Sequence, residues 1–86
     1  AYTVIIERAA LRDLKRLPGD IKDRIDHRIL SLATEPRPHG VEKLSGSDSS
    51  YRLRVGDYRI LYEIHDAILR VLVVKIGHRR EIYRDC

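Results

Sequence analysis

The sequence predicts an α+β fold with the order β-α-α-β-β-β, in which an αα-hairpin packs on one face of a small, mainly antiparallel sheet. Three observations support this prediction. Apolar residues recur at helical spacing between residues 7 and 35. From Tyr51 onward they alternate with polar residues or form a short continuous run. Between two alternating segments stands Gly56-Asp57, a pair typical of a two-residue hairpin loop.

The first half of the chain is predicted to hold one strand and one αα-hairpin. Tyr2–Ile6 is β-branched and aromatic, which indicates a strand, and Glu7–Leu17 changes to helical spacing. Pro18-Gly19-Asp20 interrupts the pattern, and a second helix follows to about Glu35, before Pro36 and Pro38. The apolar positions of that helix are Ile21, Ile25, Ile29 and Leu32, with Leu30 and Ala33 widening the stripe.

The second half is predicted to be a long loop followed by three strands. Residues 37–50 are rich in Gly, Ser and Pro and indicate a loop. The strands are expected at Tyr51–Val55, Tyr58–Ile64 and Ile68–Ile76, with Asp66-Ala67 as the last turn. Gly77 is expected to end the third strand before a tail over residues 78–84.

The Gly56-Asp57 loop fixes a register that gathers arginines on one face of the sheet. A two-residue loop pairs Arg54 with Arg59, and alternation places Arg52 beside them, away from the helices. Like charges directly opposite one another destabilise a sheet by a few tenths to about 1 kcal/mol. Two interpretations stay open. The arginines are simply solvated, or paired with Glu63 or Asp57, or they form an open anion site for a phosphate, on which Arg59 is exposed.

Composition narrows the class of protein. The 86 residues predict a single domain, 1–86, with a formal net charge of +4. Thirteen of the 17 basic residues are Arg, whose planar fork suits phosphate contact. Cys86 is the only cysteine, so no internal disulfide can form. No signal peptide or membrane-length apolar run is visible either. We therefore expect a cytoplasmic location without membrane contact.

Motifs for bound cofactors are absent from the sequence. The four histidines and Cys86 have no zinc-ligand spacing, and no phosphate loop, GxGxxG motif or acidic cluster for magnesium is present. We therefore expect no cofactor and metal-independent chemistry at any phosphodiester.

Three stretches, with the element order, resemble a known family over essentially the whole chain. They are the hairpin Tyr51–Tyr62, the run Lys43-Leu44-Ser45-Gly46 before it, and the closing Gly77–Tyr83. Together they are similar to the RelE/ParE toxin superfamily, and in the tail to its RelE-like mRNA interferase branch. The resemblance implies a fold of the microbial-ribonuclease kind.

The resemblance also implies a function and its residues. It implies the toxin of a type II toxin–antitoxin pair, a ribosome-dependent endoribonuclease that cleaves mRNA in the A site by 2′-hydroxyl attack. Its implied partners are a RelB-like antitoxin and the ribosome with its mRNA. Carried over by position, the catalytic residues are Arg52, Arg54, Arg59, Arg79 and Tyr83. The residues assigned to RNA binding are Lys43, His78 and Arg80.

The chain departs from the family pattern where the pattern has lysines on the second strand and this sequence has Arg52 and Arg54. Arginine effectively never loses its proton, so these residues suit charge stabilisation and not general-base chemistry. Lys43 and His78 are the nearest alternatives in sequence, and the base is left unassigned.

Two other functions remain open. A ParE-like toxin shares the fold and inhibits DNA gyrase without being an enzyme, and it has no chemical need for an arginine face with Tyr83. A non-toxic basic nucleic-acid-binding module is the third possibility, and growth on expression distinguishes it from both toxins.

Overall fold

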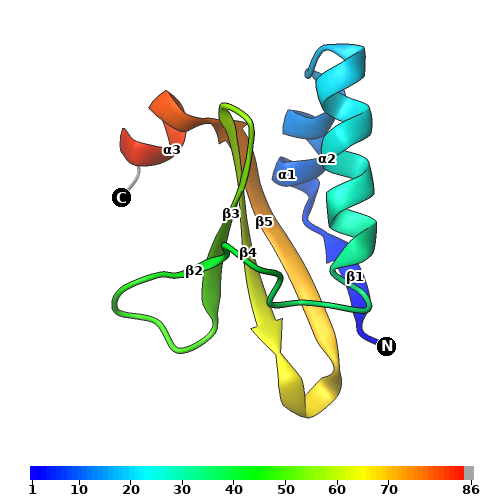
Figure 1. Cartoon of the computed structure of the whole chain (residues 1–86), viewed down its shortest axis with the longest axis vertical. Helices are drawn as coiled ribbons and strands as arrows, with labels where there is room; N and C mark the ends of the chain where they lie inside the picture. The colour runs from blue at the N-terminus through cyan, green and yellow to red at the C-terminus, as the bar shows by residue number, and fades with distance from the viewer. Residues whose placement is uncertain (85–86) are drawn as a thin grey trace.

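The fold is α+β, as predicted, and is built around one mixed sheet (Figure 1). The computed structural model describes residues 1–84, with side chains described through residue 81. Within them the sheet has five strands in the order β1-β5-β4-β3-β2. These are β1 (Thr3–Ile6), β2 (Glu42–Lys43), β3 (Ser50–Val55), β4 (Tyr58–His65) and β5 (Arg70–His78). Only β1 and β5 pair in parallel among them; the other neighbours are antiparallel.

Two helices cover one face of the sheet. They are α1 (Arg8–Lys15) and α2 (Gly19–Ser31), which run side by side in opposite directions (Figure 1). Pro18 precedes α2 in an extended conformation, and its missing N–H suits a helix start. Ala10, Leu14, Ile25 and Ile29 pack from the helices into the buried core. The predicted αα-hairpin is confirmed.

The second helix is shorter and its apolar stripe narrower than predicted. It ends at Ser31, and Leu32, Ala33 and Thr34 continue as tight turns. Leu30 is 71% exposed, so its assignment to the apolar stripe is wrong. A residue directly after Ile29 lies about 100° further around the helix and therefore leaves the face that contacts the sheet.

The central hairpin has the predicted register. Arg54 pairs with Arg59, Leu53 with Ile60, and Val55 with Tyr58. Gly56 has φ +59° and Asp57 does not have positive φ, as the first and second positions of a type II′ turn require. Alternation buries one face of this hairpin against the helices: Tyr51, Leu53, Val55, Ile60, Tyr62 and Ile64 are each at most 7% exposed.

The last strand differs from the prediction in its bounds and in its register. Ile68 belongs to a 3₁₀ turn, η1 (Asp66–Ile68), and is 59% exposed, while the strand continues past Gly77 to His78. Leu61 pairs with Lys75 but Tyr62 pairs with Val73, so Val74 is an extra residue that forms a β-bulge. The bulge turns Lys75 to the face away from the helices and keeps both Val73 and Ile76 in the core.

Two short elements were not predicted. The loop over residues 37–50 contains β2, which pairs with β3 through Glu42 and Lys43. The tail forms the helix α3 (Arg79–Arg84), which packs against β4 and β5. No helix within the described residues is long and apolar enough to cross a membrane.

Candidate functional site

The register builds two rows of side chains on the sheet face away from α1 and α2. One row crosses β3, β4 and β5 through Arg54, Arg59 and Gly77. The row next to it runs through Glu42, Arg52, Leu61 and Lys75. Residues directly opposite each other in a sheet share a face, so Arg52, Arg54 and Arg59 form one arginine face, as predicted.

Of the two arginines on β3, Arg52 is the one that forms an ion pair. Its Nη2 donates a 3.0 Å hydrogen bond to Oε2 of Glu42, and its side chain is 16% exposed. The carboxylate of this ion pair comes from β2, an element the sequence did not predict. Arg54 is exposed and forms no ion pair within residues 1–81. The exposed guanidinium of Arg54 is therefore available to an external anion.

Arg59 lies on this face but is not exposed. Only 4% of its surface is accessible, so the expectation that it stands open to solvent is wrong. Its Nη1 donates to the carbonyl oxygens of Gly56, at 3.1 Å, and Tyr58, at 3.0 Å. A buried cation requires such acceptors. Arg59 consequently supports the backbone of the β3–β4 turn, which follows the end of β3 where Arg54 lies.

The tail begins directly beside the same turn. The backbone N–H of Arg79 donates to the carbonyl oxygen of Asp57 at 2.8 Å, which fixes the first residue of α3 at the tip of the hairpin. Arg79 and Arg80 are exposed. The backbone of Tyr83 belongs to α3, and its side chain lies outside the described residues. The structure therefore brings the start of the tail to the end of the arginine face, where Arg54 lies.

Two predicted residues lie on the other side of the sheet. Lys43 pairs with Tyr51, whose side chain is in the core between sheet and helices. His78 pairs with Tyr58, and their rings meet edge to face with centroids 5.4 Å apart. Nδ1 of His78 accepts a 3.3 Å hydrogen bond from the backbone N–H of Arg80. Closeness in sequence to the arginines therefore does not bring Lys43 or His78 to the arginine face.

Lys75 is a basic residue of this face that sequence reasoning missed. It lies two positions from Arg52 in the same row, with Leu61 between them, and is half-buried. In the sequence it stands inside an apolar run, where strict alternation from Val71 and Val73 assigns it to the core. Only the bulge at Val74 moves it to the arginine face, and a bulge has no clear signal in one sequence.

A polar clamp holds the loop that leads to β2. Arg37 donates from Nη2 to Oδ2 of Asp66 at 2.8 Å and from Nε to the hydroxyl of Tyr51 at 3.1 Å. The hydroxyl of Tyr2 also donates to Asp66. The hydrogen bond from Arg37, and then that from Tyr2, lower the pKa of Asp66 to about 2. Burial raises the pKa of Tyr62, whose hydroxyl donates to the carbonyl of Pro36 at 2.8 Å.

The sequence of the chain matches a known family over almost its whole length. Residues 4–83 match the family described as ParE toxin of type II toxin-antitoxin system, parDE. The chain belongs to the RelE/ParE toxin superfamily. It is thus the toxin of a type II toxin–antitoxin system, and its relatives assign it to the RelE-like branch.

Relatives of this RelE-like toxin come from several organisms. Toxin RelG of Mycobacterium tuberculosis is 33% identical, with 96% of this chain and 97% of RelG covered. The mRNA interferase toxin RelE of Escherichia coli is 26% identical over 99% of this chain and 93% of its own. Among solved structures, the archaeal RelE–RelB complex from Pyrococcus horikoshii superimposes with a TM-score of 0.82 at 30% identity, covering 91% of this chain and 94% of that one.

Proposed function

We propose that this RelE-like toxin is an endoribonuclease that cleaves mRNA in the ribosomal A site. The observation that carries the proposal is the junction of the tail with the hairpin, where Arg79 is hydrogen-bonded to Asp57 next to the Arg54–Arg59 row. This junction supports the proposal because it brings the backbone of Arg79 to the end of the row that carries Arg54, and cations near one another suit a phosphoryl-transfer site. The E. coli relative, which is named an mRNA interferase, supports the same reaction class.

The reaction we propose uses the RNA's own nucleophile. The 2′-oxygen attacks the adjacent phosphorus and gives its proton to a base, while the bond from phosphorus to the 5′-oxygen breaks and that oxygen takes up a proton. The products are a 2′,3′-cyclic phosphate and a 5′-hydroxyl end. The charge that develops on the phosphate is spread over its non-bridging oxygens, where Arg54 and Arg79 would stabilise it. No step in this scheme requires a metal ion.

The predicted residues at and beside the arginine face then divide into several roles. Arg52, Arg54 and Arg79 would bind and neutralise the reacting phosphate, with Lys75 as an additional cation of the same face. Arg59 would act by holding the β3–β4 turn in place. Tyr83 would stack on a base, and Arg80 would contact the RNA backbone. The general base is unassigned, because an arginine cannot serve and neither Lys43 nor His78 lies on this face.

The proposed partners follow from the same relatives. The P. horikoshii structure is a complex of RelE with RelB, so we propose a RelB-like antitoxin for this toxin. The cytoplasm, where ribosomes translate mRNA, would be its place of action.

The test of the function is primer extension on a reporter mRNA in a reconstituted translation mixture. With this protein we expect new ends at codons in the A site, and none when ribosomes are left out. An Arg79→Ala variant is expected to cut at least about 100-fold more slowly, in line with the loss of one electrostatic contact to a transition state. Intact mRNA at toxin concentrations that arrest growth would contradict the proposal.

One observation favours a second function, namely that the matching family is described by the ParE toxin. A ParE-like protein would inhibit DNA gyrase by binding it. Inhibition of gyrase supercoiling, with the reporter mRNA left intact, would support that function and leave the fold and family unchanged.

A further inference from the structure

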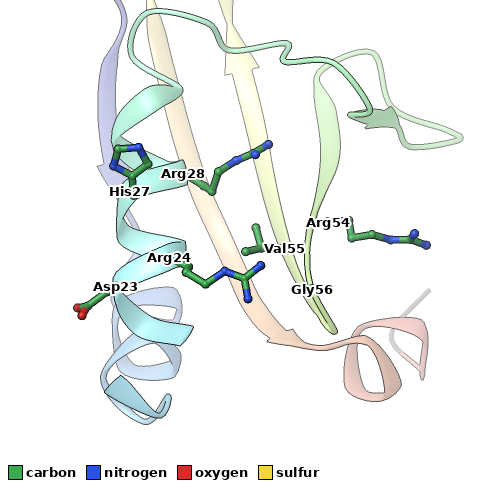
Figure 2. A pocket seen from close by; sticks show the side chains of 7 residues that line it. All are labelled: Asp23, Arg24, His27, Arg28, Arg54, Val55 and Gly56. Atoms are coloured by element: carbon green, nitrogen blue, oxygen red, sulfur yellow. The ribbon is translucent and has the colours of Figure 1, made fainter. Parts of the chain in front are cut away.

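A basic groove lies on the other side of β3 from the arginine face. It is formed by α2 and the β3–β4 turn, and its cavity of about 460 Å³ is lined by Arg24, Arg28, Arg54 and Gly56, among others. Figure 2 shows Arg24 and Arg28 reaching from α2 toward the hairpin, whereas Asp23 points away from it. A second hollow of about 420 Å³ shares Arg28 and Arg54 and continues to His39. We call these joined hollows the α2 groove.

The arginines of the α2 groove are not neutralised. Within residues 1–81, Arg24, Arg28 and Arg54 form no ion pair, although Arg37 and Arg52 each bind a carboxylate. Glu42, which lines the second hollow, is already bonded to Arg52. Like charges around one concavity repel each other and destabilise the fold. Their presence is better explained by an anion that binds there.

The geometry fits a phosphate chain better than a single anion. Arg24 and Arg28 are one helical turn apart on α2, so their side chains leave the helix on the same face, about 5–6 Å apart at Cβ. The side chain of Arg54 leaves β3 on the side away from α2 and therefore belongs to the arginine face (Figure 2). Arg54 also borders both hollows, so it stands where the arginine face and the groove meet. β2 covers the edge of β3 only at Tyr51 and Arg52, so residues 53–55 leave that edge open.

We propose that the α2 groove binds the sugar–phosphate backbone of single-stranded mRNA, in the segment next to the one that is cleaved. The strand crosses the open edge of β3 at Arg54 and meets Arg28 and Arg24 on α2. This inference rests on the proposed function for the identity of the RNA. A helix of a protein partner is a poorer fit, because such helices dock through apolar side chains, and Leu53 in this groove is only 2% exposed.

The test measures RNA binding without ribosomes. A fluorescent single-stranded RNA oligonucleotide is titrated with the protein at several salt concentrations, and anisotropy gives the affinity. The variant is Arg24→Gln with Arg28→Gln. The control is Arg8→Gln with Arg12→Gln, which removes the same charge from α1 and leaves the groove intact. Glutamine forms helix as readily as arginine, and thermal melting checks that both variants fold.

We expect the groove variant to lose affinity while the control stays close to the unmodified protein. The slope of log affinity against log salt should fall by roughly 0.7 for each phosphate contact removed. Equal losses in both variants, an unchanged slope, or no RNA binding by the unmodified protein would each overturn the proposal. An unchanged RNA affinity with weaker binding of a poly-glutamate peptide would assign the groove to an acidic protein.

This experiment is independent of the cleavage assay. If mRNA stays intact on ribosomes while RNA affinity depends on Arg24 and Arg28, the groove is an RNA-binding site, but the nuclease proposal fails and with it the identity of the RNA as cleaved message. If mRNA is cut and the groove variant binds RNA like the control, the reverse holds.

Discussion

At the scale of single residues, the arginines of one hairpin and its adjoining tail differ in environment more than in chemistry. Arg52 is held by a carboxylate, Arg59 is buried on two carbonyl oxygens, and Arg54 and Arg79 are exposed. Sequence alternation assigned Arg52, Arg54 and Arg59 to one face correctly. It could not separate them by burial, because burial depends on β2 and α3, which pack from distant parts of the chain.

This difference in burial predicts opposite effects of two neighbouring substitutions. Arg59→Ala leaves the carbonyls of Gly56 and Tyr58 without their donor, so we expect a loss of about 1.5–3 kcal/mol in the free energy of unfolding. Arg54→Ala removes an exposed charge opposite Arg59, so stability should stay within about 0.5 kcal/mol while cleavage falls. Urea unfolding and primer extension measure the two effects. An Arg59→Ala protein as stable as the unmodified one would show that the turn does not depend on this guanidinium.

At the scale of elements, the hairpin was predictable and the last strand was not. The type II′ turn at Gly56 fixes the register of β3 and β4 from local sequence alone. The register of β5 depends on the bulge at Val74, which lets Val73 and Ile76 both reach the core. That choice is made by packing against α1 and α2. Lys75 was missed for this reason, and β2 was missed because a two-residue strand has no pattern to detect.

The clamp between loop 36–41 and η1 predicts a pH dependence of stability. The pKa of Asp66 is lowered from 3.8 to about 2, so the clamp is fully formed above the unfolded value and is lost as pH falls through the folded one. We expect Asp66→Asn to be less stable than the unmodified protein at neutral pH. The difference in urea midpoint should shrink between pH about 4 and about 2. Asp48→Asn, which removes an exposed loop carboxylate, is the control. A midpoint difference that does not change with pH would argue against the clamp.

At the scale of the whole molecule, one face of the sheet forms the core and the other carries the candidate catalytic residues. The helices bury one face, and the tail meets the other at the tip of the hairpin (Figure 1). The excess of arginine over lysine predicted contact with phosphate. It could not locate the α2 groove, because only the folded chain makes Arg24 and Arg28 of α2 line one hollow with Arg54 of β3.

The chemistry proposed for the whole molecule makes one further prediction, about the substrate. If the 2′-oxygen is the nucleophile, a single 2′-deoxynucleotide on the 5′ side of the cleaved bond removes it and should abolish the cut at that bond. Neighbouring codons should still be cut, because the backbone phosphates that the arginines contact are unchanged. Primer extension on a reporter with one such substitution measures this directly, with the all-ribose reporter as control. Continued cutting at the deoxy position would mean that water is the nucleophile. Arg54 and Arg79 would then stabilise a phosphate that is attacked by water and not by the RNA's own 2′-oxygen.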